Sequence, residues 1–214
     1  MRKFAIFLTI LGALSAPGPA AAADLSPGDA DVAAAVARGV AMAKPHGGYY
    51  LKDYVVYAVP DARNIYPTRG NVDAVVLGTP LERIRHAAFF ATYTGQKATP
   101  AEARKRADLP AGWLSFILFV HGPDAFDNSF ATKYSVARLV FANKTLTAAD
   151  MKHSPPSDTV YPLATVHRNR QAATVTYRFD LSALPDLHNS RARLQFIDDG
   201  GKSFDLPVDL SRYR

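Results

Sequence analysis

Alternating apolar and polar residues mark three strands in the last third of the chain. Apolar residues occupy every second position of segments 173–181, 192–196 and 204–210. This period of two is typical of strands that bury one face and expose the other. The Asp-Asp-Gly-Gly sequence at 198–201 predicts a hairpin turn between the second and third strands. Pro207 cannot donate to a strand ladder, so the last strand is expected at a sheet edge.

Further strands are predicted upstream by apolar, β-branched and aromatic residues. Residues 113–120 (WLSFILFV) are nearly all apolar, which favours a central strand buried on both faces. Four more strands are expected by composition, at 49–59, 72–77, 134–141 and 159–167. The Arg-Asn-Arg sequence at 168–170 is expected to turn a hairpin into the strand that begins at 172, and 143–156 is expected to be mainly loop.

Three helices are predicted by their start signals. The sequence Thr-Pro-x-Glu occurs at 79–82 and again at 99–102, and each copy offers a capping hydroxyl, a proline at the first helical position and a glutamate that can reach back to the cap. The predicted helices are 80–94 and 100–107. A third helix is expected at 27–44, where Ser26 precedes Pro27 and valines recur at every fourth position from Val32 to Val40.

This succession of short strands and turns predicts a mainly β fold. The expected fold class is an antiparallel β-sandwich of immunoglobulin-like architecture, with a small two-helix insertion and a short N-terminal helix. The expected organisation is a signal peptide at 1–23, a helix or linker at 24–48, and a sandwich domain at 49–214 with the helical insertion at about 80–107.

Residues 1–23 have the pattern of a secretory signal peptide. Arg2 and Lys3 precede an apolar run at 4–14, and three alanines end at Ala23. We expect cleavage near Ala23 and a periplasmic or secreted location. No later stretch approaches the roughly 20 apolar residues of a membrane-spanning helix, so no transmembrane segment is expected.

The net charge of +6 falls to +4 when Arg2 and Lys3 are removed. Segment 79–107 holds six basic and two acidic residues, so the positive excess is local. A basic face attracts anionic groups, and the expected partner is an envelope protein, a glycan or an anionic polymer. Nucleic-acid binding is not expected, because the basic residues are not interleaved with aromatic ones.

Motifs of catalysis and of metal binding are missing from the sequence. The chain has no cysteine, which excludes thiol catalysis and thiolate metal sites. It has no G-x-S-x-G, S-x-x-K or H-E-x-x-H motif, and its six histidines are far apart. We therefore assign no catalytic residue, no metal ligand and no cofactor.

Three groups of residues are candidates for binding. Arg83 and Arg85 lie on the first insertion helix, where they could clamp an anionic ligand or form a solvated face. The loop after the apolar strand offers oxygen ligands that suit calcium, although Pro-Asp and Asp-Asn are also turn formers. Its candidates are His121, Asp124, Asp127 and Asn128. Tyr49 and Tyr57 fall on one face of a predicted strand and could stack on a sugar or peptide, or belong to the core.

The function that these observations favour is an exported, non-catalytic binding or scaffold protein of the bacterial cell envelope. Two alternatives stay open. One is a periplasmic hydrolase that uses dispersed carboxylates or histidines on an envelope polymer, a class without a sequence signature. The other is a metal-binding β-sandwich protein, with the ion in the loop that begins at His121.

Overall fold

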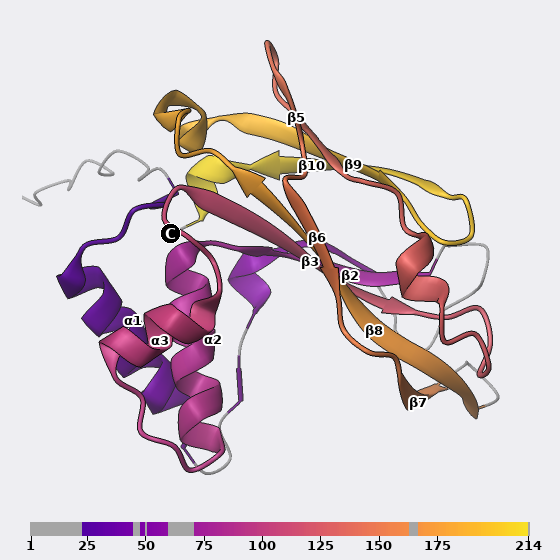
Figure 1. Cartoon of the computed structure of the whole chain (residues 1–214), viewed down its shortest axis with the longest axis horizontal. Helices are drawn as coiled ribbons and strands as arrows, with labels where there is room; N and C mark the ends of the chain where they lie inside the picture. Colours follow the sequence, from indigo (N-terminus) through magenta and orange to yellow (C-terminus); the bar gives the residue numbers. More distant parts are fainter. Residues whose placement is uncertain (1–22, 45–47, 50, 60–70, 163–166, 214) are drawn as a thin grey trace, which may run out of the picture.

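The computed structural model describes residues 23–44, 48–49, 51–59, 71–162 and 167–213, and the side chains at 159–169 are left out of the description. The described chain is mainly β, with two antiparallel sheets and three α-helices (Figure 1). The mainly β prediction is therefore confirmed, and the two sheets are compatible with a β-sandwich. Apart from Ala23, the expected signal peptide lies outside the described residues. Among the helices described, none has both the length and the apolar character needed to cross a membrane.

The larger sheet has the strand order β1-β2-β3-β8-β6, and β7 also pairs with β8. The strands are β1 (Val55–Ala58), β2 (Val72–Gly78), β3 (Trp113–His121), β6 (Asp150–His153), β7 (Ser157–Pro162) and β8 (His167–Asp180). The apolar strand β3 is central, as predicted. Only one of its faces is fully buried, because Phe119 on the other face is 38% exposed.

The smaller sheet has the order β10-β9-β4-β5. Its strands are β4 (Arg138–Val140), β5 (Thr145–Thr147), β9 (Arg191–Ile197) and β10 (Ser203–Asp209). The predicted hairpin joins β9 to β10, and Asp198 Oδ1 accepts the N–H groups of Gly200 and Lys202 in its turn. Strand β10 is an edge strand, which confirms the prediction from Pro207.

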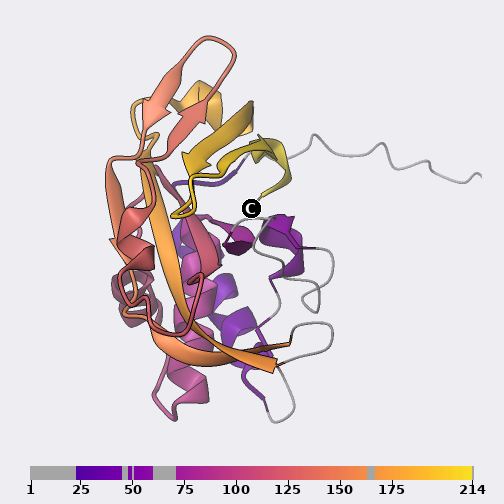
Figure 2. The same ribbon diagram turned by 90° about the vertical axis from the view of Figure 1, so that its right-hand side faces the viewer.

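A single apolar core joins the two sheets. Phe116 and Tyr177 from the larger sheet are fully buried in the same cluster as Leu139 and Leu194 from the smaller one. Figure 1 shows the smaller sheet above the larger one, and Figure 2 shows its yellow strands beside the upper part of β8. Eleven of the 27 buried residues described in this cluster belong to the alternating positions predicted from the sequence.

Tyr177 also connects the two sheets through a hydrogen bond. Its hydroxyl donates to the carbonyl of Ser135, ahead of β4, at 2.8 Å. We expect Tyr177→Phe to lower the free energy of unfolding by about 1 kcal/mol, because the partly buried Ser135 carbonyl loses its donor. Urea denaturation measures this difference. The matched control Tyr93→Phe removes an exposed hydroxyl and should leave stability unchanged; equal effects of the two substitutions would contradict the assignment.

The three α-helices are α1 (Asp29–Met42), α2 (Pro80–Tyr93) and α3 (Pro100–Ala107). The Thr79 and Thr99 side chains cap α2 and α3 by accepting the N–H groups of Glu82 and Glu102. Both caps were predicted. The cap predicted at Ser26 is wrong. Helix α1 begins at Asp29, two residues after the predicted start at Pro27, and its N-cap residue Gly28 offers no side-chain hydrogen bond.

The helices pack on one another and form a second, smaller core. Val32 and Val36 of α1 pack in this core with Ile84 and Ala88 of α2 and with residues of α3. The N-terminal helix therefore joins the helical insertion, at the left in Figure 1, and its valine stripe is buried except for Val40, which is 37% exposed.

Several predicted strand boundaries are wrong. Segment 49–59 contains a 3-10 turn, η1 (Lys52–Tyr54), before the short β1, and the first half of 134–141 precedes β4. Segment 143–156 contains β5 and β6 instead of loop alone. Residues 168–170 lie within β8, because their backbones pair with 159–161 of β7. Residues 163–166, between β7 and β8, lie outside the described residues.

Candidate anion-binding site

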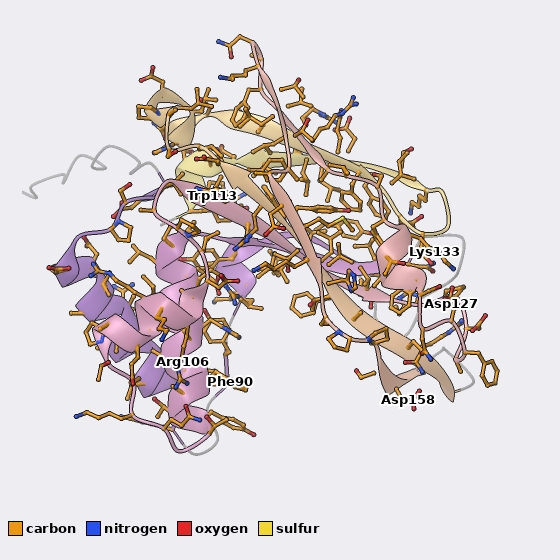
Figure 3. The ribbon with its side chains drawn as sticks, viewed as in Figure 1. Phe90, Arg106, Trp113, Asp127, Lys133 and Asp158 are labelled. Carbon is orange, nitrogen blue, oxygen red and sulfur yellow. The ribbon has the colours of Figure 1, made fainter. Side chains whose placement is uncertain are left out.

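Basic side chains from four elements line a recess between the helices and the outer face of the larger sheet. They are Arg83 of α2, Arg106 of α3, Lys152 of β6 and Arg178 of β8, with Asp108 as the acidic lining residue. We call this site the basic recess. Its volume is about 140 Å³, which suits one small anionic group better than a whole drug-sized ligand. Figure 3 labels Arg106 on the helical side and Trp113 at the start of β3.

The close approach of α2 to the sheet depends on Gly78, at the end of β2. A Cβ atom at this position would lie 2.3 Å from Ser115 Oγ and 2.9 Å from Arg83 Cδ. The Ser115 hydroxyl donates to the Gly78 carbonyl at 3.2 Å, which fixes the strand end. The absence of a side chain at Gly78 therefore leaves room for the Arg83 stem at the mouth of the recess.

Asp108 bridges the two basic residues on the sheet side of the recess, Lys152 and Arg178. It ends α3 in the left-handed region, with φ of 48°, a conformation that aspartate adopts more readily than most residues. Its carbonyl accepts from Arg178 Nη1 at 2.9 Å, and its carboxylate accepts from Lys152 Nζ at 2.6 Å. The hydrogen bond from Lys152 lowers the pKa of Asp108, so this carboxylate is ionised.

Arg178 is fixed on three sides. It forms an ion pair with Asp150 of β6, it donates to the Asp108 carbonyl, and its guanidinium carbon lies 5.8 Å from the centre of the Trp113 ring. Its Nε is buried without a hydrogen-bond partner in the described part of the chain. An arginine held in this way is preorganised, because little side-chain freedom remains to be lost on binding.

The recess keeps a positive excess after its own ion pairs are counted. Asp108 and Asp150 offset two of the four positive charges. Arg106 is exposed and makes no ion pair with a described residue, and the acidic oxygen near Arg83 is Glu82 Oε2 at 3.9 Å. Guanidinium groups bind carboxylate, sulfate and phosphate through paired hydrogen bonds. The geometry therefore suits an anionic ligand group.

Arg85, the second arginine predicted on this helix, lies away from the recess. Two residues along a helix correspond to about 200° of rotation, so Arg83 and Arg85 point to nearly opposite sides. Arg85 Nε donates to the Tyr49 hydroxyl at 3.2 Å, and that hydroxyl donates to Glu82 Oε1 at 2.6 Å. The structure thus brings two of the predicted binding residues, Tyr49 and Arg85, into direct contact, beside Glu82, which the sequence assigns to capping.

Glu82 does not complete the cap that the sequence predicts. Its side chain is fully buried, Oε1 accepts from Tyr49, and Oε2 has no hydrogen-bond partner in the described part of the chain. Burial raises the pKa of Glu82 above its ordinary value. The capping motif alone could not reveal this contact, because Tyr49 lies more than thirty residues away in the sequence.

His86 was not predicted as part of any cluster. Its ring contacts the Tyr49 ring edge-on, with centres 4.9 Å apart. Burial, reinforced by the charges of Arg83 and Arg85, lowers the pKa of His86 to about 4. The imidazole is therefore neutral in the folded protein at pH 7.

The low pKa of His86 predicts a loss of stability in acid. An unfolded histidine titrates near 6.5, so between pH 6.5 and 4 the unfolded chain binds more protons and the folded state loses stability as pH falls. The pKa difference sets an upper bound of about 3 kcal/mol, and screening of the partly exposed ring reduces the expected loss to about 1–2 kcal/mol. Urea denaturation at pH 7 and pH 4 measures it. The variant His86→Gln should lose less stability than the wild type over this range; equal losses would contradict the assignment.

The carboxylates of loop 121–128 are engaged in turns. Asp124 accepts the N–H groups of Phe126 and Asp127, at 2.7 and 2.9 Å. Asp127 accepts from Ser129 and from Lys133, and the hydrogen bond from Lys133 is the main cause that lowers the pKa of Asp127 to about 2. Figure 3 shows Asp127 and Lys133 side by side. These contacts favour turn formation over the calcium alternative.

The remaining predicted residues make separate contacts. The backbone N–H of Asn128 donates to the Phe126 carbonyl, while His121 is buried, with Nδ1 2.9 Å from Asp73 Oδ1. Tyr57 packs on Phe204, so it does not share an aromatic platform with Tyr49. Within the described residues, no group of three or more His, Asp or Glu side chains could hold a metal ion.

Comparison of the chain with protein-family models, with curated proteins and with solved structures finds no match. The chemistry of the sites described above is therefore the basis for any functional inference.

Proposed function

We propose that this protein is a non-catalytic binding protein that holds an anionic group of its partner in the basic recess. The observation that carries the proposal is the convergence of Arg83, Arg106, Lys152 and Arg178 on one concave site with a single acidic lining residue. Two regions far apart in the sequence, the helices α2 and α3 and the strands β6 and β8, supply these side chains, so the fold concentrates the positive charge.

The chemistry of the recess suits a sulfate, phosphate or carboxylate group carried by a polymer. Arg178 is preorganised by Asp108, Asp150 and Trp113, whereas Arg106 is exposed and can close on a ligand from the helical side. Charge-assisted hydrogen bonds from guanidinium groups are roughly twice as strong as neutral ones. A site of about 140 Å³ would take one such group and leave the rest of the polymer outside.

The proposed location is the periplasm or the cell exterior, after cleavage near Ala23. The basic n-region, the apolar run at 4–14 and the alanines at 21–23 support it. Cell-envelope glycans, anionic polymers and acidic envelope proteins are partners whose charge would complement the recess. We also propose an immunoglobulin-like arrangement of the two sheets, supported by their antiparallel pairing and shared core.

Binding to dextran sulfate, an anionic polymer, tests the proposed function. Isothermal titration of the purified protein should show saturable binding at 50 mM salt that weakens steeply as salt is raised, because each contact with a charged group releases counterions. Neutral dextran is the matched control and should not bind. Equal binding of the two polymers, or no binding of dextran sulfate at low salt, would overturn the proposal.

A further inference from the structure

A second cavity lies on the other side of α2, away from the basic recess. Its volume is about 160 Å³, and it is lined by residues of α1, η1 and α2. The lining charges are Arg38, Arg85 and Asp31, and most of the remaining wall is Leu81, Tyr54 and two alanines. Neither the predicted export nor the binding role of the recess accounts for this cavity.

Arg85 is held firmly at the wall of this cavity. Its guanidinium carbon lies 5.4 Å from the centre of the Tyr49 ring and 5.0 Å from that of the Tyr54 ring. Its Nε donates to the Tyr49 hydroxyl. Stacking on two aromatic rings together with one directed hydrogen bond fixes the plane of the guanidinium group, so it is preorganised for a planar, doubly accepting partner.

The hydrogen-bonding capacity of Arg85 is only partly used. Its Nη2 is buried and has no acceptor in the described part of the chain. The nearest carboxylate on the same helix, Glu82, directs Oε1 to the Tyr49 hydroxyl instead. A buried donor without an acceptor costs free energy, and an anion that accepts from Nη2 would relieve that cost.

The charges and the apolar wall together define the ligand class. Arg38 and Arg85 outnumber Asp31, so the cavity carries a net positive charge. Leu81 and the Tyr54 ring offer a surface for a short hydrocarbon chain. A cavity of about 150 Å³ in another protein accommodates benzene, which has six carbon atoms, and the present volume is similar.

We propose that this cavity binds a small aliphatic carboxylate of about six non-hydrogen atoms. The carboxylate lies between Arg85 and Arg38, and the carbon chain packs on Leu81 and the Tyr54 ring. The site combines residues of α1 and α2, so a bound ligand also holds the N-terminal helix against the insertion. This second site is separate from the basic recess, since Arg83 and Arg85 leave α2 in nearly opposite directions.

Titration with butyrate, followed by ¹H–¹⁵N NMR, tests the proposal. We expect saturable shifts in amides of α1 and α2, with a dissociation constant on the order of 1 mM, an affinity below the ceiling per non-hydrogen atom for very small ligands. Butanol and butylamine share the chain without the carboxylate, and neither should saturate. Inorganic phosphate supplies the charge without the chain and should bind at least about tenfold more weakly; phosphate binding as tight as that of butyrate would overturn the aliphatic class.

Two substitutions locate the site. Arg85→Gln should weaken butyrate binding at least tenfold. Arg38→Gln, on the exposed face of α1, should weaken it about threefold and serves as the second test if Arg85→Gln fails to fold. The control Lys105→Gln removes the same charge from α3, outside the cavity lining, and should leave butyrate affinity unchanged. Absence of butyrate binding at 50 mM, or the same affinity in all three variants, would overturn the proposal.

Discussion

Replacement of Arg83 and Arg106 by alanine in one protein is expected to weaken binding of dextran sulfate at least about tenfold at 50 mM salt. Neither side chain has a close acidic partner in the described chain: Arg106 makes no ion pair there, and Glu82 Oε2 lies 3.9 Å from Arg83. Both cations are therefore available to a ligand. A hydrogen bond to a charged group contributes about 1.5 kcal/mol or more, and 1.4 kcal/mol corresponds to a factor of ten in affinity.

The matched control for this double variant is Lys97→Ala with Lys105→Ala. It removes two positive charges from the same basic segment, but neither lysine lines the recess. We expect this control to weaken binding less than threefold, through the loss of long-range attraction alone. If both double variants weaken dextran sulfate equally, the polymer recognises the net charge of the protein and the recess is not the binding site.

The substitution Gly39→Ala is expected to lower the free energy of unfolding by about 2–3 kcal/mol. A Cβ atom at Gly39 would lie 2.3 Å from the backbone oxygen of Arg85 and 2.9 Å from the backbone nitrogen of Phe89. Both contacts are with the backbone of α2, which cannot move aside as a side chain can. The added methyl group would therefore push α1 away from α2 and open the smaller core.

The sign of this effect makes it informative. Glycine in an ordinary helix interior costs about 1 kcal/mol relative to alanine, so without close packing Gly39→Ala would stabilise the protein. The control Ala37→Gly lies on the exposed side of α1 and should lower stability by about 1 kcal/mol through helix propensity alone. Guanidinium denaturation followed by circular dichroism measures both. A more stable Gly39→Ala protein would contradict the observed close packing of α1 against α2.

The local parts of the fold could be predicted because their signals lie within a few residues. The capping residues Thr79 and Thr99 predict the starts of α2 and α3. The last hairpin is predicted by the alternation at 192–196 and 204–210 and by the turn at Asp198. Segment 134–141 was predicted less well. Its aromatic and β-branched residues suit burial in general, and the pairing of β4 with β9, more than fifty residues away, decides which of them form the strand.

The candidate site was found only in part. The basic composition of segment 79–107 indicated Arg83 as a binding residue, but no sequence pattern indicated that Lys152 and Arg178 belong to the site. Arg178 occupies a polar position in an alternating strand, which indicates solvent exposure when the strand is considered alone. The pairing of β6 with β8, and the position of α3 over this face, turn that position into the wall of a recess. Such a juxtaposition depends on tertiary structure and has no local pattern.

The fluorescence of Trp113 provides the most direct test of the basic recess. Trp113 is the single tryptophan of the chain, and its ring lies beneath the guanidinium group of Arg178. We predict that inorganic sulfate, titrated at constant ionic strength against chloride, changes the tryptophan emission in a saturable way, and that the Arg83→Ala, Arg106→Ala protein loses this response. An emission that stays constant, or a response that the double variant retains in full, would contradict anion binding in the recess.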